Sequence, residues 1–77
     1  MINQLVFVAR VDPEDIKIED GGQAKIAMLC PEDIKGSDEG GMFLRLHSWC
    51  DDGNDHPEFD ALIKPGKEYV IRIQQVE

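Results

Sequence analysis

The side chains able to act as nucleophiles or as general bases are few in this sequence. The nucleophile candidates are Ser37, Ser48, Cys30 and Cys50, and the candidate bases are His47 and His56. Catalysis requires a nucleophile within hydrogen-bond reach of an oriented base. Neighbours in a strand point to opposite faces, so His47 and Ser48 do not form such a pair. Cys50 and His56 are within reach across one loop, but a thiol at a strand end and a helix-capping histidine explain them better. We therefore predict no catalytic residue and no enzymatic activity.

Metal and phosphate sites are also poorly supported by the residue spacing. Zinc would have to be held by one set of four residues, Cys30, His47, Cys50 and His56. That set lacks a close cysteine pair, which zinc sites usually contain. The Asp-rich loop 51–55 fails as an EF-hand, because His56 and Leu62 stand where a glycine and an acid are required. No Walker-type or Gly-x-Gly-x-x-Gly run is present. We expect neither a metal nor a cofactor.

A row of aromatic and basic side chains is the strongest candidate for a binding surface. Residues 42–49 alternate, and one face of that segment collects Phe43, Arg45, His47 and Trp49. We expect Arg72, on a neighbouring strand, to extend this surface. Such a row is typical of a single-stranded nucleic acid platform and equally of a protein-binding hot spot. A third interpretation is a second packing face, covered by a helix at 57–63, with Arg45 paired to loop acids.

The charge of the chain bears on the choice between these partners. Sixteen acidic and eight basic residues give a formal net charge of −8. Such a field repels nucleic acid and anionic membranes, and it favours a basic protein partner. Most of the acids fall in turn-like stretches, so we expect an acidic rim around strands that carry scattered cations.

The elements that must position this row are short strands. Two-residue alternation and turn signals predict strands at 5–11, 16–18, 23–30, 42–49 and 68–76, with a helix at 57–63. The fold class is therefore all-β, or β-rich with one short helix, in a single domain over residues 1–77. Closure removes exposed strand edges, so we expect a small five-stranded barrel, SH3-like or OB-like. A helix directly before the last strand is the SH3-like order.

The cysteine count and the hydropathy pattern indicate the compartment. Two cysteines do not make a disulfide framework. No apolar stretch resembles a secretory h-region or reaches the length of a membrane span. We expect a cytoplasmic protein with both thiols free.

One pentapeptide occurs twice. The sequence Pro-Glu-Asp-Ile-Lys at 13–17 recurs at 31–35, and each copy precedes a Gly-Gly pair and a strand. One interpretation is a duplicated acidic docking element. The alternative, which we favour, is a repeated way of leaving a strand, with Pro starting one helical turn and Ile entering the core.

Residues 42–73 carry a family resemblance. The segment runs from Gly41-Met42-Phe43-Leu44-Arg45-Leu46-His47-Ser48-Trp49 through His56-Pro57-Glu58-Phe59-Asp60-Ala61-Leu62-Ile63 to Tyr69-Val70-Ile71-Arg72-Ile73. It resembles small uncharacterised proteins encoded by bacteriophages and prophages. The resemblance implies a phage-related origin and a structural unit joining Ser48-Trp49 to Phe59 and Leu62. It implies no catalytic residue, and the chain departs from the pattern at Cys50 and Pro65.

We therefore expect a non-enzymatic, acidic binding or adaptor protein that docks onto another protein, a basic one among the candidates. The alternative is an OB-like single-stranded nucleic acid module. A third interpretation is an accessory subunit stable only as a homo-oligomer, because a chain of 77 residues builds a thin core.

Overall fold

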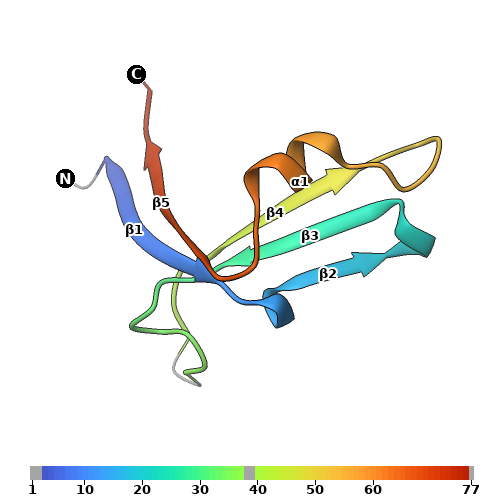
Figure 1. Ribbon diagram of the computed structural model, residues 1–77. Helices are drawn as coiled ribbons and strands as arrows, with labels where there is room; N and C mark the ends of the chain where they lie inside the picture. The colour runs from blue at the N-terminus through green and yellow to red at the C-terminus, as the bar shows by residue number, and fades with distance from the viewer. Residues whose placement is uncertain (1–2, 38–39, 77) are drawn as a thin grey trace.

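The chain is mostly β. A computed structural model describes residues 3–37 and 40–76, and within them five strands form two sheets beside one short α-helix (Figure 1). The elements are β1 (Gln4–Val11), β2 (Ile16–Glu19), β3 (Ala24–Leu29), β4 (Leu44–Trp49), α1 (Pro57–Leu62) and β5 (Lys67–Gln74). Every expected strand and the expected helix are confirmed, with boundaries that differ by at most two residues.

The larger sheet is an antiparallel meander in the order β2-β3-β4. Ala27, at its centre, pairs with Ile16 on one side and with Leu46 on the other. The middle strand is covered on both faces, since Ala24 and Ile26 are as buried as Ala27 and Leu29.

The second sheet is a two-stranded antiparallel ribbon of β1 and β5, in which Val8 pairs with Val70. Ala9 and Val11, near the end of β1, are fully buried against the main core. Beyond them the ribbon diverges from the three-stranded sheet (Figure 1). Much of the ribbon is therefore supported by few neighbours.

The expected SH3-like or OB-like barrel closure is not found among the described residues. β1 pairs with β5 alone, and β2 pairs with β3 alone. Between them the chain makes a 3₁₀ turn, Pro13–Asp15. Pro13 has no N–H to continue a ladder, so pairing stops there and the chain turns into a separate sheet.

Helix α1 covers one face of the three-stranded sheet. Phe59 and Ile63 are buried in the core beside Ala27 and Leu29. The Lys25 ammonium lies 5.4 Å from the centre of the Phe59 ring and pairs with Asp60. The hydrogen bond from this lysine holds the pKa of Asp60 below its usual value of 3.8. These contacts fix the helix to one side of the sheet.

The two copies of the repeated pentapeptide contact each other. In each copy the backbone turns with a hydrogen bond back toward the proline end, from Asp15 to Asp12 and from Ile34 to Pro31. The Lys35 ammonium donates to Asp12 and Asp15, at 2.7 Å each. The repeat thus closes a loop onto the end of β1, which supports the structural interpretation over a separate docking element.

Candidate binding face on the three-stranded sheet

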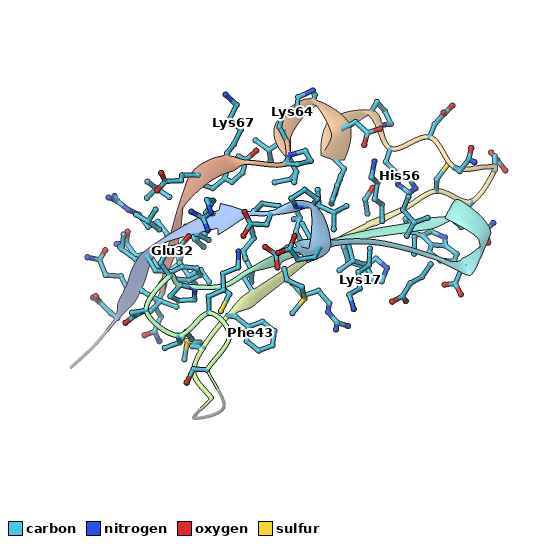
Figure 2. The ribbon with its side chains drawn as sticks, turned by 60° about the horizontal axis from the view of Figure 1, so that its bottom comes forward. Lys17, Glu32, Phe43, His56, Lys64 and Lys67 are labelled. Atoms are coloured by element: carbon cyan, nitrogen blue, oxygen red, sulfur yellow. The ribbon has the colours of Figure 1, made fainter. Side chains whose placement is uncertain are left out.

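The sheet face turned away from α1 carries the aromatic and basic row. Register places Arg45 opposite Met28, His47 opposite Ile26 and Trp49 opposite Ala24. Lys17 joins the same face, because it pairs with Ile26 from the other side. In Figure 2, Lys17 and Phe43 project from this side, whereas His56 lies on the side of the helix. We call this surface, formed by Lys17, Met28, Phe43, Arg45, His47 and Trp49, the outer face.

Both aromatic residues of the outer face are exposed. Phe43 keeps 52% and Trp49 keeps 54% of its surface open to solvent. The interpretation of this row as a packing face beneath residues 57–63 is therefore wrong, because α1 lies on the opposite side of the sheet. The alternation of β4 explains why: Leu44, Leu46 and Ser48 point toward α1 and away from the row.

The cations of the outer face have no acidic partner within residues 3–37 and 40–76. The ion pairs there involve Arg10, Lys25 and Lys35, whereas Arg45 and Lys17 form none. The expected pairing of Arg45 with loop acids is thus not found among these residues. At the Trp49 end the charge reverses, since the indole N–H donates to the Asp51 carboxylate. Glu19 stands on the same face in register with Ala24.

Arg72 does not extend this row. It belongs to β5, which pairs with β1 and not with the three-stranded sheet. It is exposed on the ribbon, in register with Val6. Of the five residues predicted for one site, four are brought together and Arg72 is placed on a different sheet.

Strand β4 is an edge strand with unused backbone groups. The Cys50 N–H donates to the Gln23 carbonyl at 2.9 Å. Because hydrogen-bonded pairs alternate along an antiparallel ladder, Leu44, Leu46 and Ser48 exchange backbone bonds with β3. The N–H and C=O groups of Arg45 and His47 therefore point away from β3. Neither has a hydrogen-bond partner in the part of the chain that the structure describes.

A shallow groove of about 200 Å³ lies between β4 and α1. Its lining is mainly apolar and comprises Leu46, His47, Ser48, Glu58, Phe59 and Leu62. Leu62 is 60% exposed there, so the groove has an uncovered apolar wall. The outer face and this groove lie on opposite sides of the same free edge.

The structure also brings together a serine and a histidine that sequence reasoning did not pair. Ser48 Oγ lies 2.9 Å from His56 Nδ1, and His56 Nε2 lies 2.8 Å from the Gly22 carbonyl oxygen. A carbonyl only accepts, so Nε2 carries a proton and donates to it, and Nδ1 is left to bond the Ser48 hydroxyl. Both ring nitrogens are engaged, which leaves none for Cys50. The buried His56 ties β4 to the turn at Gly22.

Cys30 and Cys50 are both free thiols. No group of three or more His, Cys, Asp or Glu side chains in ranges 3–37 and 40–76 is placed to hold a metal ion. No helix in these ranges is long and apolar enough to cross a bilayer. Comparisons of the chain with protein-family models, curated proteins and solved structures found no match.

Proposed function

We propose that this protein is a non-enzymatic docking protein that binds an extended segment of another protein along β4. The observation that carries the proposal is the free edge of β4, where the backbone groups of Arg45 and His47 have no partner among the described residues. Adding a strand to such an edge supplies affinity through backbone hydrogen bonds. Pockets for alternate side chains then supply specificity.

The surroundings of the edge define the side chains that the segment would carry. On one side its residues meet the cation Arg45 and the ring of Phe43. On the other side they enter the groove beside Leu46 and the exposed Leu62. A segment that alternates apolar residues with acidic or aromatic ones fits both sides at once. A basic partner surface would instead face the loop carboxylates, away from the row.

Single-stranded nucleic acid is the second candidate, favoured by two exposed aromatic rings beside two cations that form no ion pair within the described residues. Base stacking on such rings is insensitive to sequence. Against it stand the carboxylates of Asp51 and Glu19 at the Trp49 end. They oppose a phosphate chain where its bases would stack. The net charge of −8 adds to this repulsion, and a protein segment is favoured.

Two finer predictions accompany this proposal. The order of elements, with α1 directly before β5, fits an SH3-like fold left open. The likeness of residues 42–73 to phage and prophage proteins favours a phage-related origin. Neither prediction determines the function, since one fold serves many activities.

A displayed library of random peptides of about ten residues, the upper range of strand length, tests the proposal. We expect selection on the immobilised protein to enrich sequences that alternate apolar residues with acidic or aromatic ones. Free protein carrying Leu62→Lys should compete less well than free wild type for the enriched peptides, because that change removes the apolar wall of the groove. Failure to enrich any sequence over a blank surface would contradict the proposal. Enrichment of basic peptides would move the binding site to the acidic loops.

A further inference from the structure

The surface of the β1–β5 ribbon that faces away from the core is apolar at its centre. Even-numbered residues occupy this face, and Val6, Val8 and Val70 expose 46%, 45% and 68% of their surface. An isolated two-stranded ribbon is marginally stable in water. This face lies on a different sheet from β4, so the inference drawn from it is independent of the proposed docking site.

The whole chain is less compact than a closed domain of its length. Its radius of gyration is 13.9 Å, whereas a compact domain of this length has about 11.5 Å. Its accessible surface is 5883 Å², against about 4,700 Å² for a folded monomer of this mass. The diverging ribbon is the main departure from a rounded shape (Figure 1). The molecule therefore exposes more surface than a rounded monomer of its mass.

Glu68 and Arg72 on this ribbon face can complement the same two residues of a second copy, whereas Arg10, opposite Glu68 on the same face, pairs with Asp12 and Glu32. Glu68 and Arg72 lie on β5 on either side of Val70, and all three are exposed. Consider a two-fold axis that passes next to Val70, parallel to the ribbon face and perpendicular to the strands. It places the same face of a second copy against this one, with β5 of the second copy running in the opposite direction. Val70 then meets Val70 of a second copy, and Glu68 of each copy meets Arg72 of the other. A two-fold interface requires this kind of self-complementarity.

We propose that the ribbon binds a second copy of this chain through Val6, Val8 and Val70, with Glu68 and Arg72 pairing across the two-fold axis. A ribbon of eight residues is about 26 Å long and 10–15 Å wide. It covers on the order of 300–400 Å² per copy, below the roughly 800 Å² per partner of a standard stable interface and in the range of weak, transient contacts. The association is therefore reversible and depends on concentration. It gives Arg72 a role apart from the outer face and leaves β4 open in both copies.

Sedimentation equilibrium over a concentration series tests this dimer with charge-reversed variants. The unmodified chain should approach twice its monomer mass as concentration rises. Arg72→Glu alone and Glu68→Arg alone should each weaken association by about ten-fold or more, since each sets like charges across the interface. An equal mixture of the two single variants should regain the dimer, because one copy then offers two acids and the other two bases. The double variant should also dimerise.

Two controls keep the result specific. Arg45→Glu on β4 makes the same change in net charge as Arg72→Glu and should leave the dimer intact. Val70→Lys should dissociate it, whereas Ile18→Lys, at an equally exposed position on β2 (66% against 68%), should not. A monomer at every concentration would overturn the proposal. Equal weakening of the dimer by Arg45→Glu and Arg72→Glu would also overturn it. The same holds if the mixture of Arg72→Glu and Glu68→Arg stays monomeric while both variants retain native circular dichroism.

Discussion

The Lys35 ammonium lies 2.7 Å from the Asp15 carboxylate, and this contact joins the two copies of the repeated pentapeptide. The same ammonium donates to Asp12 and to the carbonyl of Arg10. One lysine thus holds the loop after β3 against the end of β1. The corresponding lysine of the first copy, Lys17, has no ion pair among the described residues and stands on the outer face. Identical pentapeptides therefore serve two different purposes.

Lys35→Met should lower the free energy of unfolding, and the loss should depend on pH. The hydrogen bond between the two side chains holds the pKa of Asp12 below its usual 3.8 and that of Lys35 above 10.5. A lowered carboxyl pKa stabilises the fold above 3.8, and this stability is lost as the pH falls through the folded value. A raised ammonium pKa stabilises the fold below 10.5, and this is lost as the pH rises through the folded value. Urea unfolding across pH measures both losses.

The difference between wild type and Lys35→Met should be constant from about pH 5 to about pH 9 and shrink outside that window. Lys17→Met is the matched control, because it removes the same side chain from the first copy of the repeat. Its effect on stability should be smaller and independent of pH. Equal losses in the two variants would show that the contact between the copies contributes nothing.

Phe59→Ala should unfold much of the protein. Phe59 keeps only 4% of its surface exposed and packs against Ala27 and Leu29. Removing such a ring costs about 3–5 kcal/mol, which is a large part of the stability of a small domain. Leu62→Ala, at a 60% exposed position of the same helix, should cost much less. Urea denaturation compares the two, and similar midpoints would refute the assigned core.

Gly22→Ala should destabilise the turn that His56 binds. A Cβ at Gly22 would lie 2.7 Å from the Cβ of Asn54, and the backbone φ there is +100°. The close contact and the positive φ both disfavour a side chain at this position. Backbone strain of this kind lowers the free energy of unfolding by about 1–3 kcal/mol. Gly53→Ala is the control, since nothing lies within 4 Å of its added Cβ. Thermal unfolding should show a lower midpoint for the Gly22 variant alone; an unchanged midpoint would be evidence against this close approach.

Alternation alone predicted which side chains of β4 face outward, so this feature of the candidate site was predictable from the sequence. Phe43, Arg45, His47 and Trp49 share a face because the period of a strand is two residues. Local turn chemistry at Pro13, and at Pro57 at the start of α1, placed the element boundaries.

The remaining features depend on pairings between distant residues. Alternation does not say which strand lies beside which, so two features were not predictable: the placement of Arg72 on a separate ribbon, and the open sheets of the described residues in place of a closed barrel. The Ser48–His56 contact arises because the loop after β4 folds back over that strand, and neighbouring residues gave no signal for it. A free edge, likewise, is defined only once the order β2-β3-β4 is known.

Trp49 fluorescence should distinguish a protein segment from nucleic acid. Trp49 is the only tryptophan, and it is exposed on the outer face. Titration with short single-stranded DNA or RNA at low salt should leave its emission unchanged, because Asp51 and Glu19 repel phosphates there. Titration with a selected peptide should change the emission. Quenching by oligonucleotides that weakens steeply with added salt would instead favour the nucleic acid alternative.

The affinity of a selected peptide for two variants at His47 tests the β4 docking account most directly. His47→Pro removes the outward N–H while leaving the bonds to β3, which an edge strand tolerates. His47→Ala removes the imidazole and keeps the N–H. We predict that the proline variant, with native circular dichroism, loses peptide binding by about ten-fold or more, as expected for a lost backbone hydrogen bond in a desolvated edge. The alanine variant should bind nearly as wild type does. Equal binding by the proline variant and wild type would contradict strand addition at β4.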